Sequence, residues 1–451
     1  MMRTLTLSAA AQEFGGTLMY PDCGFDAVST DSRHLVEGEL FVALRGERFD
    51  AHQFLPEVAT RACGMVVERP ARDINVPQWV VPNTTVALGQ LAALNRRSFF
   101  GPLLAVTGSS GKTTVKEMIA SILGECGAVL ATRGNLNNQI GVPLTLLQLN
   151  ARHRYAVIEM GASGPGEIEY LCSLARPDVV LVNNVLPAHV EGFGSLEGVA
   201  RAKGEIYRGV APEGTAVINL DEPWAQGWRT SASAAVLTYS LQSDSADFCA
   251  RDLVNEQGCF RFVLVTPAGD VAVTLSLGGR HNVANALAAA ACAYAAGAGL
   301  ETIAAGLEKV QPVSGRLYRH GLPGGGVVLD DTYNANPGSV KAAVDALLAL
   351  PGRHILVLGD MGELGDDEAR LHGEVGRYAA QQGVEHLLAT GPLSLNSVRE
   401  FGAGGEHFDS KEALVEQLRA LLTPESVVLV KGSRFMAMET VVQQIIDTGE
   451  A

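Results

Sequence analysis

The stretch LLAVTGSSGKTT, residues 103–114, decides the fold of this chain. Its apolar start, residues 103–106, has the length and composition of a buried parallel strand. Small residues follow at positions 108–111, where the backbone must turn sharply and approach a ligand closely. A helical pattern begins at Lys112. Strand, turn and helix start bring backbone N–H groups and the positive end of a helix dipole to one point, which predicts an anion site.

The same stretch is typical of a nucleotide-binding P-loop. Lys112 supplies a point charge for the outer phosphates, and the Thr113 hydroxyl can bind Mg²⁺. The general pattern has a glycine where this chain has Val106, so the match is to a shorter variant. The residues expected to contact ATP here are Gly108, Ser109, Ser110, Gly111, Lys112, Thr113 and Thr114. The alternative, a glycine-rich turn with a solvated lysine, is disfavoured because the strand, the loop and the helix all match the pattern of a phosphate-binding loop.

Composition indicates an ordinary globular protein of two or three domains. The chain has 451 residues, of which 47% are hydrophobic and 18% charged. Its 50 glycines are about 11% of the chain, above the usual ~7%, as expected for many tight strand–helix turns. The net charge of −15 argues against nucleic acid as the main partner, because phosphate-backbone binding needs a basic surface.

Cysteine usage and hydropathy predict a cytoplasmic protein without a membrane span. The seven cysteines form no C-x-x-C pair, so neither a disulfide framework nor a thiolate zinc site is indicated. Gln12 and Glu13 interrupt the short Ala-rich start, which does not resemble a signal peptide. Residues 283–300 carry no charge, but alanine and glycine dominate them, so we predict a buried helix there.

We predict an α/β protein of three domains. Boundaries are expected near Pro82 and Val313, giving a small α/β domain at 1–83, a central P-loop domain with a parallel sheet at 84–313, and a Rossmann-like, doubly wound domain at 314–451. Thr84 or Thr85 is expected to cap the first helix of the central domain. Alternating polar and apolar residues at 248–277 predict a small β insertion. In the last domain, VVLDDT, HILVLGDM, HLLAT and SVVLV are the predicted strands.

Two side chains beyond predicted strand ends are candidates for the same site as the P-loop. Glu159 ends the strand YAVIEM, and His189 follows the strand at 179–182. Ligands in open α/β sheets collect beyond the carboxyl ends of the strands, so both side chains are expected near the P-loop. A histidine is more often structural than a ligand, but the convergence favours a functional role for His189.

Two polar segments and one lysine leave alternatives open. The loop TDSR is rich in groups that bind phosphate, ribose or base edges, although a solvated turn fits equally well. Clustered asparagines in GNLNNQIG are as consistent with a loop conformation as with a site. Lys203 lies on a predicted helix, where a lysine is ordinarily solvated. The residues concerned are Thr30, Asp31, Ser32, Arg33, Asn135, Asn137 and Asn138.

In combination, these motifs resemble those of the Mur ligases, ATP-dependent enzymes that extend the peptidoglycan stem peptide one addition at a time. TGSSGKTT is similar to the P-loop of the family, including its missing early glycine, and TDSR with GELFVALRGERFDAHQF is similar to its UDP-sugar-binding start. Six further segments resemble those of the family member that adds D-alanyl-D-alanine: TRGNLNNQIGVPLTLL, AHVEGFGSLEGVARAKGEI, GRHNVANALAAA, DDTYNANPGS, VLGDMGELG and KGSRFMAME. The resemblance covers nearly the whole chain.

The resemblance implies a reaction and its substrates. ATP would phosphorylate a carboxylate of UDP-N-acetylmuramoyl-tripeptide to an acyl phosphate. The amine of D-alanyl-D-alanine would attack it, and the tetrahedral intermediate would lose phosphate. Such an enzyme must neutralise phosphoryl charge, hold the acceptor near the γ-phosphate and exclude water. Domain closure is expected during turnover, and we expect a monomer.

The resemblance also implies roles for individual residues. Lys112 would contact the outer phosphates, Thr113 and Glu159 would serve one magnesium ion, and His189 would bind a second. Lys203 would be carbamylated, becoming an anion that can bridge or orient metal. These are the expected catalytic groups. ATP would also meet His281 and Asn282 on its adenine side, and Arg316 and Asp331 from the third domain. The UDP-sugar would meet Thr30, Asp31, Ser32, Arg33, Asn135, Asn137 and Asn138. The D-alanyl-D-alanine pocket would include Tyr333, Asn334 and Asn336.

Three other functions remain as alternatives. A diaminopimelate- or lysine-adding Mur ligase is one, although the D-N-P-R string of the diaminopimelate enzyme is absent. A folylpolyglutamate synthetase is another, disfavoured by TDSR. A nucleotide-switched binding protein would need a base-specificity motif such as N-K-x-D, which this sequence does not contain.

Overall fold

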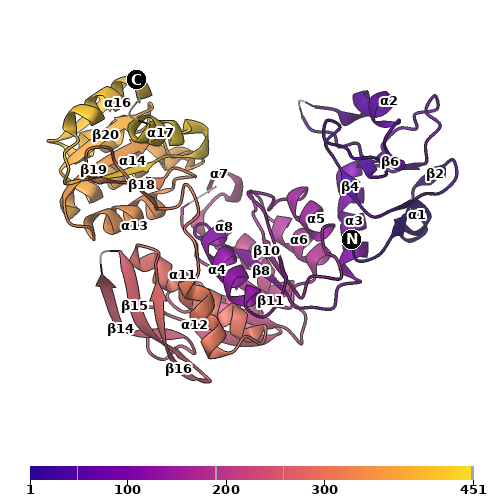
Figure 1. Cartoon of the computed structure of the whole chain (residues 1–451), viewed down its shortest axis with the longest axis horizontal. Helices are drawn as coiled ribbons and strands as arrows, with labels where there is room; N and C mark the ends of the chain where they lie inside the picture. Colours follow the sequence, from indigo (N-terminus) through magenta and orange to yellow (C-terminus); the bar gives the residue numbers. More distant parts are fainter. Residues whose placement is uncertain (48, 188–189, 257, 448–451) are drawn as a thin grey trace.

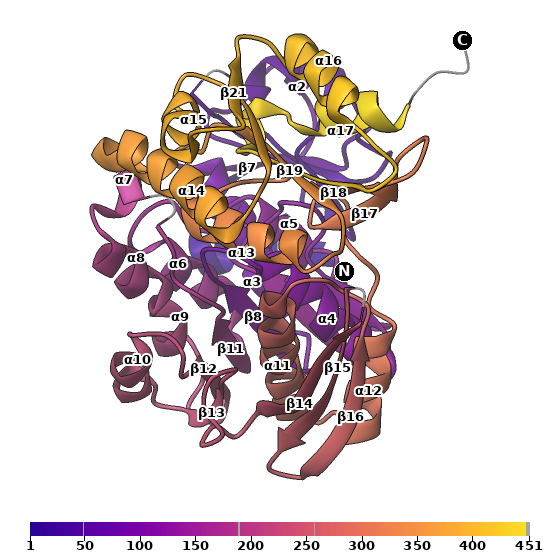
Figure 2. The ribbon, with the colours of Figure 1, turned by 90° about the vertical axis from the view of Figure 1, so that its left-hand side faces the viewer.

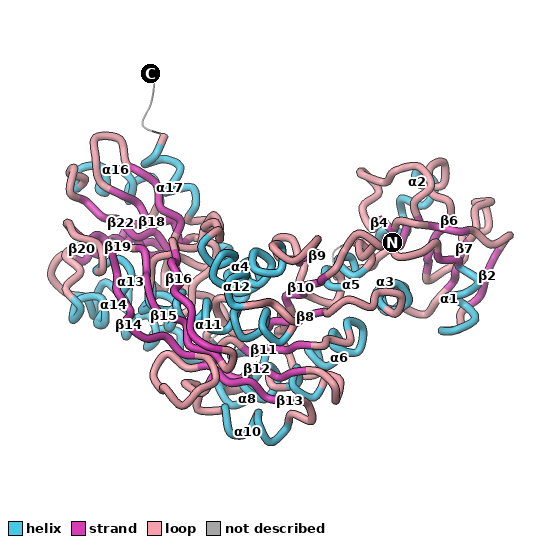
Figure 3. The backbone as a smooth tube through the Cα atoms, turned by 60° about the horizontal axis from the view of Figure 1, so that its bottom comes forward, coloured by secondary structure: helices cyan, strands magenta, loops and turns pink. Residues whose placement is uncertain are grey.

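The computed structural model describes residues 1–451 apart from 48, 188–189, 257 and 448–451. The chain forms three α/β bodies along its long axis, with the N-terminal and C-terminal bodies at opposite ends and the P-loop body between them (Figures 1 and 3). The predicted α/β architecture with parallel sheets is confirmed.

The N-terminal body is built on a small sheet with the strand order β2-β7-β6-β5-β4, in which β2 is antiparallel to β7 and the other pairs are parallel. A separate pair, β1 and β3, is antiparallel. The elements are β1 (Leu5–Thr6), α1 (Leu7–Phe14), β2 (Thr17–Met19), β3 (Gly24–Phe25), β4 (Val28–Ser29), β5 (Leu40–Val42), a 3₁₀ turn (Ala51–Phe54), α2 (Leu55–Val58), β6 (Gly64–Val67) and β7 (Gln78–Val80).

The central sheet is fully parallel, with the strand order β13-β12-β11-β8-β10-β9. Its P-loop strand β8 is buried along its whole length. Leu103 and Ala105 belong to one core and Leu104 and Val106 to the other, as the two-residue period of a strand requires. The strands are β8 (Leu103–Thr107), β9 (Val129–Ala131), β10 (Tyr155–Glu159), β11 (Val179–Val182), β12 (Thr215–Asn219) and β13 (Ala235–Tyr239).

Helices cover both faces of the central sheet, and the antiparallel insertion β14-β15-β16 packs beside α12 (Figure 2). The helices are α3 (Thr84–Arg96), α4 (Lys112–Gly124), α5 (Gly141–Leu146), α6 (Glu167–Ala175), α7 (Val190–Phe193), α8 (Leu196–Lys203), α9 (Glu205–Arg208), α10 (Ala225–Ser231), α11 (Arg280–Ala295) and α12 (Leu300–Glu308). The insertion, β14 (Cys249–Glu256), β15 (Cys259–Thr266) and β16 (Gly269–Leu275), lies where alternation predicted it.

The sequence makes a specific prediction for each of two helices of the central body: the capping residue of α3 and the burial of α11. The N-cap of α3 is Asn83, whose Oδ1 accepts from the N–H groups of Thr85 and Val86, so the predicted threonine cap is wrong. The Thr84 hydroxyl instead donates to the carbonyl of Ala43. Helix α11 is buried, as expected, but it ends at Ala295 instead of continuing to residue 300. No helix in the described part of the chain is long and apolar enough to cross a bilayer.

The C-terminal body is a doubly wound sheet with the order β17-β18-β22-β19-β20-β21, parallel except at its edge strand β17. Cores lie on both of its faces. The strands are β17 (Tyr318–Gly321), β18 (Val327–Asp331), β19 (Arg353–Gly359), β20 (His386–Thr390), β21 (Gly405–Phe408) and β22 (Ser426–Lys431). The helices are α13 (Pro337–Leu348), α14 (Glu368–Gln382), α15 (Leu395–Phe401), α16 (Lys411–Leu421) and α17 (Glu439–Ile446), with 3₁₀ turns at Gly365–Asp367 and Arg434–Met436.

Candidate active site between the central and C-terminal bodies

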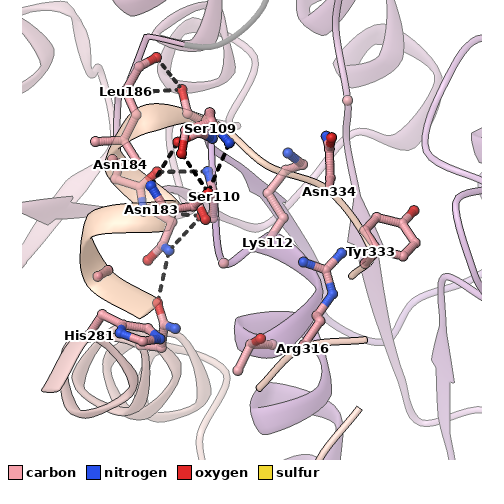
Figure 4. A pocket seen from close by; sticks show the side chains of 18 of the residues that line it. Ser109, Ser110, Lys112, Asn183, Asn184, Leu186, His281, Arg316, Tyr333 and Asn334 are labelled. Carbon is pink, nitrogen blue, oxygen red and sulfur yellow. Dashed lines mark hydrogen bonds between the residues drawn. The ribbon is translucent and has the colours of Figure 1, made fainter. Parts of the chain in front are cut away.

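A cavity of ≈ 460 Å³ lies between the carboxyl ends of the central strands and those of the C-terminal sheet (Figure 4). Many of the sequence-predicted residues meet on its walls. From the central body these are Ser109, Ser110, Gly111, Lys112, Thr114, Asn135, Asn137, Asn138, Glu159, Lys203, His281 and Asn282. From the C-terminal body they are Arg316, Asp331, Tyr333, Asn334 and Asn336.

The P-loop is shaped by Gly111, the N-cap of α4. Its φ of +75° lies in the left-handed region that glycine adopts without strain. A Cβ at this position would lie 2.6 Å from Asn183 Nδ2, so a side chain has no room. No side chain caps α4, which leaves the first N–H groups of the helix for an anionic ligand.

Two asparagines beyond β11 hold the P-loop in place. The N–H of Ser109 donates to the carbonyl of Asn184, and the N–H of Ser110 donates to Asn184 Oδ1 at 2.8 Å. Asn183 Nδ2 donates to the carbonyl of Ser110 and to Asn285 Oδ1 on α11 (Figure 4). The loop is therefore preorganised by neutral amides, and its cationic group stays available to the ligand.

That cationic group is Lys112. Its Nζ donates to the carbonyl of Gly108 at 2.7 Å, folding the side chain back over the loop. Burial lowers the pKa of the ammonium group, which the charge of Glu159 partly offsets. An incoming triphosphate would add to the negative charge that Glu159 supplies.

Glu159 has an oxygen-rich surrounding that fits Mg²⁺. Its Oε2 accepts from Thr113 Oγ1 at 2.8 Å, and its Oε1 accepts from Asn137 Nδ2 at 2.8 Å. Carboxylate and hydroxyl oxygens are ligands that Mg²⁺ prefers, completed by waters and phosphate. No group of three His, Cys, Asp or Glu side chains able to hold a metal occurs within the described ranges. The predicted ligand His189 lies outside the described residues.

Lys203 ends α8 with its side chain turned into the cavity and only 1% exposed. Its Nζ lies 5.9 Å from the ring centre of Phe193. Burial lowers the pKa of this amine to about 7, and the nearby charge of Lys112 acts in the same direction. Much of the population therefore carries a neutral, nucleophilic amine near neutral pH. Lys203 is therefore not solvated, as a helical lysine ordinarily is, and it lies in the cavity beside the P-loop.

The C-terminal wall faces the P-loop with Arg316 and Asp331. The Arg316 guanidinium stacks on the Tyr333 ring at 4.2 Å (Figure 4). It also donates to Thr113 Oγ1 at 2.9 Å. Asp331 ends β18 and pairs through Oδ2 with Lys431 Nζ at 2.5 Å. Lys431 also donates to the carbonyl of Asn334, so the loop after β18 is tied to the end of β22.

Three other residues predicted to bind substrate line the cavity, and two of them also make hydrogen bonds within the protein. His281 and Asn282 lie in the first turn of α11, and burial lowers the pKa of His281. Asn282 Oδ1 accepts from Asn285 Nδ2, which joins it to the amides behind the P-loop. Asn336 is the N-cap of α13 in a capping box with Ser339, so its Oδ1 is already engaged.

The TDSR loop does not line the cavity. Asp31 accepts two bonds from the guanidinium of Arg33 and one interaction from His34, and these partners hold the pKa of its carboxyl well below the usual range. The loop lies in the N-terminal body, away from the P-loop (Figure 1). The structure thus places Thr30, Asp31, Ser32 and Arg33 apart from the other predicted residues.

Sequence reasoning missed several polar residues on the cavity wall. Asn183 and Asn184 directly follow β11, so the strand-end rule could have selected both. The same rule does point to Lys431, which ends β22, although no role was predicted for it. Asn137, a predicted contact of the UDP-sugar, also donates to the Glu159 carboxylate. Its proximity to Glu159 depends on tertiary structure and has no local signal.

Comparisons with protein families agree with this architecture. The family model of the Mur ligase middle domain matches residues 106–293, and that of the Mur ligase, glutamate ligase domain matches residues 315–434. The chain belongs to the Mur ligase family. Among Mur ligases, it is 46% identical to a UDP-N-acetylmuramoyl-tripeptide–D-alanyl-D-alanine ligase of Escherichia coli, over 99% of this chain and 100% of that one.

Solved structures extend the likeness to three dimensions. The Mur ligase MurF from Acinetobacter baumannii has a TM-score of 0.94 and 38% identity, covering 99% of this chain and 100% of its own. MurF from Thermotoga maritima in complex with ADP has a TM-score of 0.84 and 28% identity, covering 93% of this chain and 96% of its own. The predicted family is therefore confirmed.

Proposed function

We propose that this Mur ligase joins D-alanyl-D-alanine to UDP-N-acetylmuramoyl-tripeptide at the expense of ATP, releasing ADP and phosphate. The observation that carries the proposal is the cavity in which the α4 N-terminus, Glu159 and Lys203 face Arg316 and Asp331. The full-length likeness to ligases of that name supports the choice of substrates. The product would be the UDP-muramoyl-pentapeptide of peptidoglycan synthesis.

The first chemical step transfers a phosphoryl group to the acceptor carboxylate. The free N–H groups of α4 and the Lys112 ammonium stabilise the negative charge that spreads over the phosphoryl oxygens. Arg316, on the opposite wall of the cavity, is placed to stabilise the same negative charge. The resulting acyl phosphate is an activated acyl donor, whereas the free carboxylate is not.

Thr113 and Glu159 are the residues that would hold Mg²⁺ here, with His189 and a carbamylated Lys203 for a second ion. When bound, Mg²⁺ would neutralise charge on the phosphoryl group. Carbamylation joins the neutral Lys203 nitrogen to the carbon of CO₂ and releases one proton. The burial of Lys203 and its pKa of about 7 support this modification, because only the neutral amine is nucleophilic.

In the second step the amine of D-alanyl-D-alanine attacks the acyl carbon, and the tetrahedral intermediate expels phosphate. We assign the dipeptide to Tyr333, Asn334 and Asn336, which line the C-terminal wall. We assign the UDP-sugar to residues 30–33 of the first domain (1–83) and to Asn135, Asn137 and Asn138. Because residues 30–33 stand away from the cavity, closure of the domains 1–83, 84–313 and 314–451 would be needed to complete the site.

We place the protein in the cytoplasm as a monomer. Its cysteines are free thiols, which is typical of a reducing compartment. The cavity walls come from one chain, so a second copy is not required to build them.

The test is incubation with ATP, Mg²⁺ and UDP-N-acetylmuramoyl-tripeptide, with and without D-alanyl-D-alanine, followed by mass spectrometry. The pentapeptide nucleotide should appear only in the complete mixture, with one phosphate released per product. A panel of diaminopimelate, lysine and glutamate separates the related amide ligases. Phosphate release that is undiminished without any acceptor amine would instead favour a nucleotide-switched binding protein.

A further inference from the structure

Helix α4 carries a second buried lysine one turn after the P-loop lysine. Lys116 is 2% exposed and does not line the cavity, so the proposed reaction gives it no contact with substrate. Its Nζ donates to the carbonyl of Thr132 at 2.8 Å and pairs with the half-exposed carboxylate of Glu117.

Thr132 stands at the point where the β9–β10 ladder ends. Paired residues run only to Val157 and Ala131. Beyond them, the N–H of Thr132 donates to the carbonyl of Val157. Its side chain then replaces the missing ladder partner, because Thr132 Oγ1 accepts from the N–H of Glu159 at 2.9 Å. Thr132 thus fixes the backbone of the residue that presents the proposed magnesium carboxylate.

The contact between Lys116 and the carbonyl of Thr132 requires a buried ammonium group, which is unfavourable if the contact serves stability alone. Removing an ammonium ion from water is costly, and well-packed apolar residues often replace buried ion pairs without loss of stability. The ammonium of Lys116 is bound to a carbonyl one residue beyond β9, whereas the helix carrying it begins at the phosphate-binding loop. The bond therefore links the nucleotide side of the site to the metal side.

We propose that Lys116 and Thr132 are positioning residues that hold Glu159 in the orientation needed for Mg²⁺, coupling the P-loop helix to the metal carboxylate. This inference rests on the proposed function for the identity of the reaction. The chain of contacts is Lys116 Nζ to Thr132 O, and Thr132 Oγ1 to the N–H of Glu159. Thr113 and Asn137 then orient the two carboxylate oxygens of Glu159.

The test compares four variants with a matched control. Thr132→Val and Lys116→Met remove the two contacts with little change of volume, while Thr132→Ser and Lys116→Arg retain a hydroxyl and a cation. Ser121→Ala is the control, because Ser121 on the same helix donates to the carbonyl of Gly306, on α12 and remote from Glu159. Binding of Mn²⁺ in the presence of a non-hydrolysable ATP analogue is measured by the electron paramagnetic resonance of the free ion.

We expect Thr132→Val and Lys116→Met to weaken Mn²⁺ binding by about 10-fold or more, as loss of outer partners of metal ligands does. The Mg²⁺ concentration for half-maximal ligation should rise by a similar factor, whereas the KM for D-alanyl-D-alanine should not change. Thr132→Ser and Lys116→Arg should restore most of the affinity. Ser121→Ala should bind Mn²⁺ as the unmodified chain does.

Wild-type Mn²⁺ affinity in Thr132→Val would overturn the inference, as would an equal loss in Ser121→Ala. Should Lys116→Met fail to fold, as judged by its unfolding temperature, the near-isosteric Thr132→Val carries the test. The Mn²⁺ measurement needs no ligation. If the unmodified protein binds Mn²⁺ with the analogue but forms no pentapeptide nucleotide, the proposed function fails while the positioning inference is still judged by the variants.

Discussion

Replacing Lys203 by methionine should make the protein more stable and inactive at the same time. The amine is buried, and its pKa falls from the ordinary 10.5 to about 7 because the interior disfavours its charge. Methionine has a similar length and carries no charge, so the desolvation cost disappears. The amine proposed to become the carbamate disappears with it.

The size of the effect follows from proton linkage. Between pH 7 and 10.5 the unfolded chain binds more protons at this residue than the folded chain, so the free energy of unfolding rises with pH across that window. Below pH 7 the charged amine of Lys203 destabilises the folded state by its full desolvation cost, about 5 kcal/mol at most. By pH 9 the remaining cost is about 2 kcal/mol.

The assay is thermal unfolding of Lys203→Met and the unmodified protein at pH 6 and pH 9. At about 2–4 °C per kcal/mol, and allowing for relaxation of the interior, the variant should unfold about 5–10 °C higher at pH 6. The advantage should be less than half as large at pH 9. Lys309→Met, at an exposed ion pair, is the control and should show a small difference that does not depend on pH. No pentapeptide nucleotide should form with Lys203→Met.

Equal or lower stability of Lys203→Met at pH 6 would refute the reasoning. So would a stabilisation of the same size at both pH values, because it would not arise from the charge of the amine. Full ligase activity in the variant would remove Lys203 from the proposed machinery.

Other predictions concern the P-loop and two buried charged groups. Gly111→Ala should lower the affinity for a fluorescent ATP analogue by at least about 10-fold, because a Cβ there meets Asn183 and the left-handed backbone costs about 1 kcal/mol. Burial raises the pKa of Glu222 to about 7, so the free energy of unfolding falls as pH rises from 4.5 to 7. Glu222→Gln should therefore be more stable above pH 7, by up to about 3 kcal/mol, and unchanged below pH 4.5 in urea titrations. Lys431→Met should destabilise the C-terminal body by up to about 3 kcal/mol in calorimetry, because it leaves the Asp331 carboxylate, which is 14% exposed, without its cationic partner.

Features with a local cause were predictable from the sequence. The strand–loop–helix at 103–124 needs only its own apolar run, small residues and helical period. The β insertion followed from alternation, and Glu159 followed from its position at a strand end. In contrast, β17 (Tyr318–Gly321) was missed because its residues are mostly polar, and it forms only as an antiparallel edge on β18.

The burial of Lys203 shows both a limit of sequence reading and a usable signal. A helical lysine is ordinarily solvated, and only the family resemblance favoured a role for it. However, Lys203 is four residues after Val199 and three before Ile206, both fully buried, so it lies on the apolar face of its helix segment. The pairing of Asn137 with Glu159 has no such signal, because the loop after β9 brings Asn137 to the end of β10, a contact that depends on tertiary structure.

The strand order of the last sheet has a consequence for protein synthesis. Strand β22 is the last of that sheet to leave the ribosome, yet it lies between β18 and β19 near the middle of the sheet. A nascent chain that stops before Ser426 has two separated halves of a sheet and lacks the cation that neutralises Asp331. Premature stop codons far along the gene should therefore give products that are degraded rather than partly active enzymes.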